Sequence, residues 1–202
     1  MFKSPHDLSY FDHLYEQNDD PWGYENRWYE ARKRQICLSM LLKPMYQHGL
    51  EIGCSNGVFS RLLAKRCHQL TCLDGHAQAV QLAQQKLKDY PHVEVIQQHI
   101  PHQFPQGKYD LIVVSEILYY LTQDELEKTL EFIQDALTSE GLLLCCHWRY
   151  PIKGFEFDGD AVHQMLKQKL KLNHYLSCQD PDFLVDVWSV ETQSLAQAEG
   201  LI

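Results

Sequence analysis

The stretch Leu50-Glu51-Ile52-Gly53-Cys54-Ser55-Asn56-Gly57 joins the end of a predicted strand to the start of a predicted helix. Glycine at its two turn positions lets the backbone take a positive φ and approach a ligand closely. Asp74 ends the next predicted strand, where an acidic side chain can accept hydrogen bonds from both hydroxyls of a ribose. Together these residues predict a nucleoside-containing cofactor at the strand ends. A glycine-bearing turn without a ligand is the simpler alternative, and Asp74 argues against it.

Short apolar runs alternate with helix-period segments on both sides of this stretch. Strands separated by helices form βαβ units, so the pattern predicts an α/β fold with a doubly wound, Rossmann-like, mainly parallel sheet. The last two strands are close in sequence, so we expect an antiparallel pair at the sheet edge. We expect one domain over 1–202, with a helical cap at 1–45, a core at 46–190 and a surface tail at 191–202. The predicted helices are 5–17, 24–42, 58–67, 77–88, 122–137 and 160–170, and the predicted strands are 50–52, 70–73, 93–96, 109–115, 141–147, 173–178 and 183–190.

Length and composition exclude several classes of protein. The chain has 202 residues, 45% hydrophobic and 22% charged, which suits one globular domain. No apolar run reaches the ~20 residues of a membrane span, and no secretory signal is visible. A net charge of −9 argues against nucleic acid as a partner. The seven cysteines are irregularly spaced without a CxxC pair, so we expect reduced thiols and a cytoplasmic protein. No pattern sets an oligomeric state.

The chemistry of the turn selects among nucleoside cofactors. A dinucleotide site uses G-x-G-x-x-G to seat a diphosphate on a helix N-terminus, but here Cys54 replaces the middle glycine. Glu51 would repel a diphosphate and would favour an ammonium or sulfonium. S-adenosylmethionine carries both groups and a ribose. A nicotinamide-dependent oxidoreductase is therefore disfavoured, and Glu51, Gly53, Cys54, Gly57 and Asp74 are the predicted cofactor-binding residues.

Further blocks carry a family resemblance. The segment 110–121 contains Ser115-Glu116-Ile-Leu-Tyr119-Tyr120, a later block reads His147-Trp148-Arg149, and the N-terminal part contains Asp20-Pro21-Trp22-Gly23-Tyr24 with Trp28, Tyr29, Glu30 and Lys33. With the glycine turn, these blocks resemble class I methyltransferases of the nodulation protein S (NodS) type over about 10–188. The resemblance implies S-adenosylmethionine as cofactor and N-methylation of an amino sugar, a deacetylated chitooligosaccharide or a related small amine. It adds Ser115, Trp22, His99 and Ile100 to the cofactor site. His99 departs from the Asp that such enzymes often use for adenine.

Residues after the fourth and fifth strands supply the predicted acceptor chemistry. Glu116 stands at a strand end, where a carboxylate can stabilise a cationic product and accept a proton. His147 ends the next strand and suits proton transfer near neutral pH, although a lone His there is more often structural. Tyr120 completes the predicted catalytic group, and Tyr119 and Trp148 are predicted to contact the substrate. Core packing is the alternative for the two tyrosines.

Two further groups of residues have predicted roles at the site. Asp158 and His163 are predicted substrate-loop residues, with Asp160 as a helix N-cap. A metal site at these three residues is disfavoured. Trp22 and its neighbouring aromatics form a predicted lid that excludes water, with plain docking to the core as the alternative. A small-molecule O-methyltransferase and a non-catalytic S-adenosylmethionine-binding protein stay open as alternative functions.

Overall fold

The computed structural model describes residues 9–202, and its strands form one seven-stranded sheet. The predicted helix start at 5–8 lies outside the described residues. The strands are β1 (Tyr46–Ile52), β2 (Cys67–Asp74), β3 (Val93–Gln97), β4 (Tyr109–Ser115), β5 (Leu137–Trp148), β6 (Asn173–Gln179) and β7 (Phe183–Ser189). The helices are α1 (Ser9–Gln17), α2 (Trp28–Ser39), α3 (Ser60–Leu63), α4 (Ala77–Leu87), α5 (Gln123–Ala136), α6 (Gly159–Lys169) and α7 (Leu195–Ala198), with short 3₁₀ turns η1 (Ala64–Arg66) and η2 (Leu118–Tyr120).

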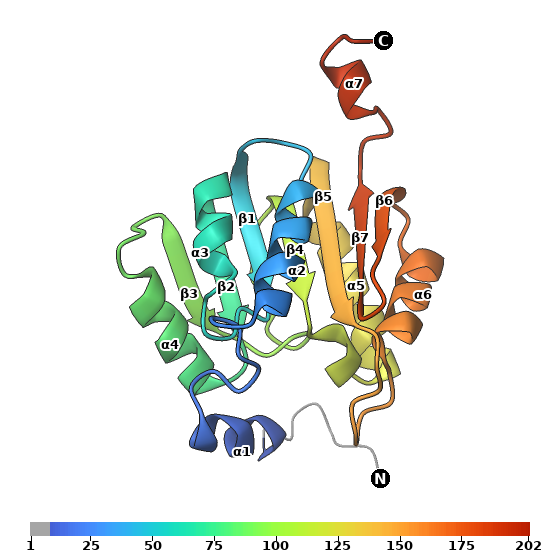
Figure 1. The fold of residues 1–202 in the computed structure, drawn as a ribbon. Coiled ribbons are helices and arrows are strands. Elements are labelled where there is room, and N and C mark those ends of the chain that lie inside the picture. Colours follow the sequence, from blue (N-terminus) through green and yellow to red (C-terminus); the bar gives the residue numbers. More distant parts are fainter. Residues whose placement is uncertain (1–8) are drawn as a thin grey trace.

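The sheet has the order β3-β2-β1-β4-β5-β7-β6 (Figure 1). Strands β1 to β5 pair in parallel, whereas β7 pairs antiparallel with both β5 and β6. The predicted fold class is therefore confirmed, with β6 at the edge. Strand order reverses between β1 and β4, and ligands of doubly wound folds bind at the carboxyl ends of strands beside this point.

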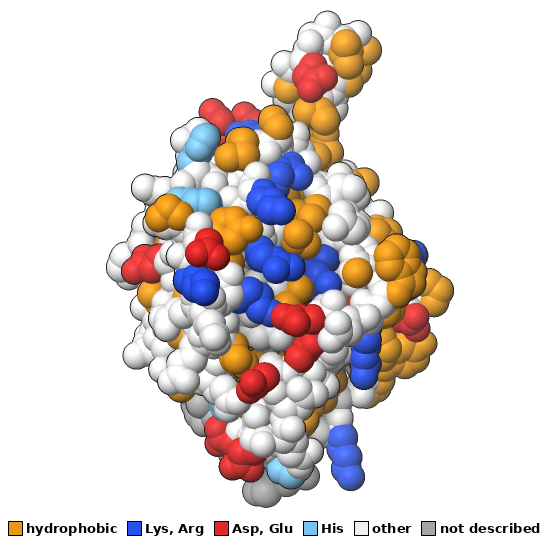
Figure 2. Space-filling view, turned by 60° about the vertical axis from the view of Figure 1, so that its left-hand side comes forward, with side chains coloured by type: hydrophobic (Ala, Val, Ile, Leu, Met, Phe, Trp, Pro, Cys, Tyr) orange, Lys and Arg blue, Asp and Glu red, His pale blue; other side chains and the backbone are white. Residues whose placement is uncertain are grey.

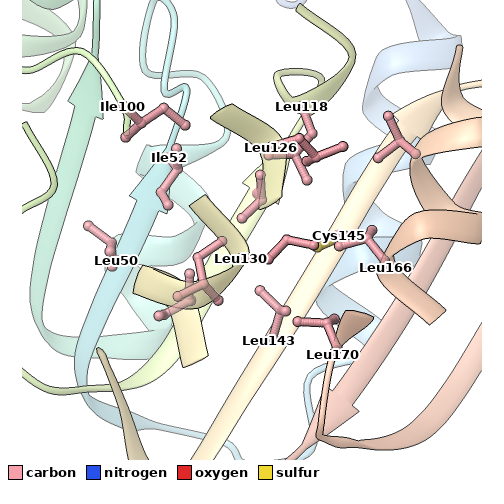
Figure 3. Packing of buried hydrophobic residues seen from close by; sticks show 14 of the residues in the cluster. Leu50, Ile52, Ile100, Leu118, Leu126, Leu130, Leu143, Cys145, Leu166 and Leu170 are labelled. Carbon is pink, nitrogen blue, oxygen red and sulfur yellow. The ribbon is translucent and has the colours of Figure 1, made fainter. Parts of the chain in front are cut away.

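Helices cover both faces of the sheet. Alternate residues of β4 point to opposite sides: Ile112 and Val114 pack with residues of α5 and α6, whereas Leu111 and Val113 pack with residues of α2, α3 and α4. Figure 3 shows part of the first layer, in which Leu126 and Leu130 of α5 and Leu166 of α6 meet the sheet. This double burial explains why the strand is an almost unbroken apolar run.

Local sequence signals set some helix ends and tertiary contacts set others. The Thr122 hydroxyl and the Glu125 side chain form the capping box that starts α5. Helix α2 begins at Trp28 instead of residue 24, because the Asp20 carboxylate accepts the backbone N–H groups of Tyr24 and Glu25 and holds a turn there. The predicted helix 58–67 is limited to α3 and η1.

The N-terminal segment lies across the carboxyl ends of the parallel strands, with α1 beneath them in Figure 1. Side-chain hydrogen bonds fasten it there. Tyr15 Oη lies 2.8 Å from Ser55 Oγ, and Asn56 Nδ2 donates to Asp20 Oδ1 at 3.2 Å. His76 Nε2 lies 3.0 Å from Asp12 Oδ1. The cap is thus tied to both the glycine turn and the end of β2.

Charged side chains are unevenly distributed over the surface, and one face carries a group of basic side chains although the chain as a whole is acidic. Figure 2 shows Lys and Arg side chains gathered near the centre of one face, with several acidic side chains below them and others toward the edges. Helix α7 stands away from the body in the same view and in Figure 1, so the predicted tail contains a short helix. All seven cysteines are free thiols. Across residues 9–202, none of the helices has both the length and the apolarity to cross a membrane.

Candidate active site

A cavity of about 520 Å³ lies between the carboxyl ends of the strands and the N-terminal cap. This volume is in the range of small-molecule sites, ~300–1,000 Å³. Ten of the residues predicted for the site line it, namely Trp22, Gly53, Asp74, His99, Ile100, Ser115, Glu116, Tyr119, Tyr120 and Trp148. Residues at the ends of β1, β2 and β4 and residues of the cap therefore line the same cavity.

One end of the cavity is built by Asp74 and the glycine turn. The Asp74 carboxylate accepts the backbone N–H of Ser55 and the backbone N–H of His76, both at 2.9 Å. Burial raises the pKa of Asp74, and these two hydrogen bonds lower it. Gly53 has φ +82°, and a Cβ there would lie 3.1 Å from Ile117 Cβ. Glycine thus keeps the cavity floor open beside a fixed carboxylate.

Aromatic rings form the wall that the cap contributes. The Trp22 ring lies 5.8 Å from Tyr15 and 5.5 Å from Tyr24, measured between centroids. All three rings line the cavity. Aromatic faces attract cations, and the attraction is larger where water is excluded. This wall suits a ligand with a positive charge, such as a sulfonium.

Two buried polar atoms beside Asp74 lack a hydrogen-bond partner within residues 9–202. They are Gln98 Oε1 and His76 Nδ1, and both residues line the cavity. A buried acceptor or donor without a partner is costly, so these atoms fit a ligand that completes their hydrogen bonds. Gln98 follows β3, next to the His99 predicted for the adenine contact. The hydrogen-bonding groups of this end therefore fit an adenosyl group.

Glu116 organises the opposite end. Its Oε1 accepts from Lys33 Nζ at 2.5 Å, and its Oε2 accepts from Tyr119 Oη at 2.6 Å and from the backbone N–H of Trp148 at 2.8 Å. Glu116 has φ +59°, a backbone conformation that residues other than Gly seldom adopt. Its contacts with the surrounding residues must therefore hold it there. Burial and then the Glu116 charge raise the pKa of Tyr119 well above its ordinary value, so its hydroxyl remains a donor.

Lys33 is a cation buried between two carboxylates. It is 4% exposed, and its Nζ also donates to Glu30 Oε1 at 3.1 Å. Burial by itself lowers the pKa of Lys33, but the charge of Glu116 and other neighbours outweighs burial and raises it. Burial raises the pKa of Glu30, and Lys33 lowers it. Arg34 Nη1 also lies 3.9 Å from Glu30 Oε2, so two carboxylates and two cations balance at this end of the cavity.

Three predicted cofactor residues do not line the cavity. Glu51 is 2% exposed and lies behind the turn, where burial raises its pKa to about 7 and the Ser60 and Cys72 side chains lower it. Cys54 is buried in the core. Gly57 has φ +76°, and its backbone packs on Ala83 of α4. The expectation that the Glu51 carboxylate faces the cofactor is wrong, because the last residues of a strand alternate between its faces.

The predicted acceptor residues His147, His163 and Asp158 also lie outside the cavity. His147 is fully buried beneath η2, and its Nδ1 lies 3.1 Å from His163 Nε2. Asp158 is the N-cap of α6, a role predicted for Asp160, because its carboxylate accepts the backbone N–H of Ala161. Asp160 pairs with Arg149 instead. The expectation that His147 points into the cleft is therefore wrong.

Sequence reasoning missed Lys33, Glu30 and Gln98 as residues of the site, and it placed Tyr29 only among the aromatic residues of the predicted lid. Lys33 and Glu30 are one turn apart on α2, and both are buried although the helix is otherwise polar. The Tyr29 hydroxyl lines the cavity region and has no hydrogen-bond partner among the described residues. The sequence did contain an indication of Lys33, Glu30 and Tyr29. They lie close together in the N-terminal part of the chain, with charged side chains on the helix face that must dock on the sheet.

Comparisons with known proteins agree with this geometry. The family model of nodulation protein S (NodS) matches residues 11–180. Nodulation protein S of Sinorhizobium fredii is 34% identical over 104 residues, 51% of this chain and 48% of that protein, so the matched stretch spans about half of the relative. A candidate methyltransferase structure from Pseudomonas syringae is 43% identical, with a TM-score of 0.73, and the match covers 81% of this chain and 99% of that one.

A second solved structure shows the same likeness with a ligand bound. The N-methyltransferase NodS from Bradyrhizobium japonicum WM9, in complex with S-adenosyl-L-homocysteine, is 27% identical with a TM-score of 0.79. That match covers 89% of this chain and 97% of that one. With the family model matching most of its length, the chain belongs to the nodulation protein S family.

Proposed function

We propose that this chain is an S-adenosylmethionine-dependent methyltransferase that N-methylates an amino sugar or a related small amine. The observation that carries the proposal is one cavity with two chemically different ends. At one end, Asp74 and Gln98 provide hydrogen-bonding groups and Gly53 leaves room for a ligand, which suits an adenosyl group. At the other end, the charged cluster around Glu116 suits an amine. Kinship with the NodS N-methyltransferase supports the same reaction. We include the whole chain in one catalytic domain, with 1–45 as its cap.

At the cofactor end, the residues of the chain bind the cofactor and fix its orientation. Asp74 has lone pairs left beyond its two backbone hydrogen bonds, and these accept the ribose hydroxyls. Trp22 and Tyr15 line the cavity, so their rings would hold a sulfonium there, and the cap over the strand ends would limit the access of water to it. When bound, S-adenosylmethionine supplies an electrophilic methyl group. Alignment of two bound reactants contributes ~7–11 kcal/mol to such a reaction.

At the acceptor end, Glu116 acts as a fixed negative charge. An amine attacks as the free base and becomes a cation, so the charge that develops is positive. Arg34 and Lys33 balance Glu30 and Glu116 in charge, and Glu116 is the carboxylate at the cavity wall that stabilises a cation formed beside it. Tyr119 and the Trp148 backbone keep the carboxylate in place. Trp148 also presents a flat ring to the cavity, which suits a sugar.

The test is transfer of a radiolabelled methyl group to matched acceptors. Glucosamine and partly deacetylated chitooligosaccharides are compared with N-acetylglucosamine and fully acetylated chitooligosaccharides. Label in the free amines alone, located on nitrogen by mass spectrometry, is the expected result. Equal labelling of the acetylated compounds would indicate an O-methyltransferase. Binding of S-adenosylhomocysteine without transfer to any amine would overturn the proposed reaction.

A further inference from the structure

A line of hydrogen bonds runs through buried side chains outside the cavity. The backbone N–H of Leu118 donates to His147 Nε2 at 3.4 Å. His147 Nδ1 lies 3.1 Å from His163 Nε2, and His163 Nδ1 lies 2.6 Å from Asp186 Oδ2. His147 and Asp186 are 0% exposed and His163 is 1% exposed. The line connects β5, α6 and β7 to the first residue of η2.

The direction of every proton in this line follows from its first member. A backbone N–H only donates, so His147 Nε2 must carry no proton. The proton of the neutral His147 ring is then on Nδ1, and it is donated to His163 Nε2. That nitrogen is therefore also unprotonated, so His163 carries its proton on Nδ1 and donates it to Asp186. Both rings are neutral with the proton on Nδ1.

Charges around the line agree with this arrangement. Burial lowers the pKa of His147 well below its ordinary value, which favours its neutral ring. Burial would raise the pKa of Asp186, but hydrogen bonds from His163, Ser177 and His174 outweigh burial and lower it. His174 Nε2 lies 2.7 Å and Lys167 Nζ 3.3 Å from the Asp186 carboxylate. Asp186 is thus a buried anion aimed at His163.

The line ends on the turn that carries the acceptor-side tyrosines. The Leu118 side chain is fully buried in the layer of Figure 3, so η2 is anchored on the core side. The next residue, Tyr119, donates to Glu116, and its ring lies 5.4 Å from the His147 ring at an interplanar angle of 74°. His147 therefore supports both the backbone of η2 and the ring that holds the Glu116 carboxylate.

We propose that His147, His163 and Asp186 form a positioning relay that fixes η2 and, through Tyr119, the carboxylate of Glu116. The three residues touch neither the acceptor nor the cofactor. Their effect on turnover rests on the proposed function, whereas the proton positions do not. The relay predicts that acceptor methylation depends on the hydrogen-bonding capacity of residue 163, while cofactor affinity does not.

The first experiment measures proton positions in the unmodified protein. Long-range ¹H–¹⁵N NMR of the histidine rings distinguishes the two neutral tautomers and the charged form. We expect a proton on Nδ1 and none on Nε2 in both His147 and His163, as the hydrogen-bond line requires. A proton on Nε2 of His147, or a charged His163, would overturn the relay. This measurement needs no acceptor, so its result is separable from failure of the proposed function.

The second experiment uses two variants of similar volume. In His163→Gln, the amide oxygen can accept from His147 and the amide nitrogen can donate to Asp186, whereas the thioether of His163→Met cannot donate and accepts only weakly. We expect the methionine variant to exchange the Leu118 amide at least tenfold faster and to lose at least tenfold in kcat. The glutamine variant should stay within about threefold of the parent in both. Affinity for S-adenosylhomocysteine should change less than twofold in either.

Equal effects of the two variants on amide exchange and kcat would show that residue 163 acts only by packing. Loss of S-adenosylhomocysteine binding in step with kcat would place its effect at the cofactor end, against the relay. If the methionine variant does not fold, the tautomers measured in the parent protein decide whether the relay exists. If no amine is methylated by the parent, the Leu118 exchange rates and the tautomers still test the relay.

Discussion

Lys33→Met removes the cation at the centre of the acceptor end and leaves its carboxylate partners in place. Lys33 and Glu30 are 4% and 6% exposed, and the Lys33 ammonium contacts Glu116 at 2.5 Å. Breaking a buried ion pair from one side costs about 3–5 kcal/mol, because the partner charge is left without its cation. Here Glu116 would keep only its hydrogen bonds from Tyr119 and Trp148, while Arg34 stays near Glu30. We therefore expect the free energy of unfolding at pH 8 to fall by about that amount, as measured in urea.

The loss should depend on pH in a defined direction. Burial raises the pKa of Glu30 and Lys33 lowers it, so removal of Lys33 should raise the pKa of Glu30 further in the folded variant. Stability of the variant relative to the parent should then rise as the pH falls from 8 to 5, by up to ~1.4 kcal/mol per pH unit for each proton bound. The deficit should be smallest at pH 5.

A surface pair provides the matched control. Lys43 lies 2.9 Å from Glu140, with 34% and 65% of the side chains exposed. Lys43→Met should cost less than ~1 kcal/mol at either pH, because exposed ion pairs are weak. If the two methionine variants lose equal stability, or if the Lys33 deficit is the same at pH 8 and pH 5, then Lys33 is not the counter-charge that holds this site together.

Substitutions at three further positions test other parts of the structure. Asp74→Ala should weaken S-adenosylhomocysteine binding at least ~100-fold by calorimetry, since hydrogen bonds to a charged group contribute ~1.5–3 kcal/mol each; unchanged affinity would remove Asp74 from the ribose site. Gly57→Ala should cost about 2 kcal/mol in urea, because φ is +76° and the new Cβ would lie 3.0 Å from Ala83 Cα; a neutral effect would contradict that close packing. Thr122→Ala should cost about 1 kcal/mol while Thr122→Ser stays near the parent, through loss of the α5 N-cap; equal losses would contradict the capping role.

The fold could be predicted because its signals are local. The apolar run at β4 and the capping box of α5 are each contained in one short segment, and both appear in the structure. Strand starts were less accurate. Strand β1 begins at Tyr46, four positions before the predicted 50, where the Asp110 side chain accepts the backbone N–H groups of Gln47 and His48. That contact joins two strands far apart in sequence, so no local pattern contains it.

The site could be predicted only in part, for a different reason. Placing Asp74 and Glu116 at the cavity needed only the rule that ligands lie beyond the strand ends. Placing Glu51 and His147 needed knowledge of which face each side chain takes, and neighbouring strand residues face opposite sides. Lys33 was missed because a buried lysine depends on carboxylates from its surroundings, and one of them, Glu116, follows a strand in the middle of the chain.

The backbone of Glu116 connects these observations. Its left-handed conformation, φ +59°, costs on the order of 1–2 kcal/mol, yet no glycine occupies the position. Its backbone N–H donates to the Cys146 carbonyl at 2.9 Å, and its carboxylate is held by three further donors. Glycine would relieve the backbone strain and lose all three side-chain bonds. The strain therefore persists because this conformation aims a carboxylate into the cavity, and the relay beneath η2 secures one of the donors that keeps it there.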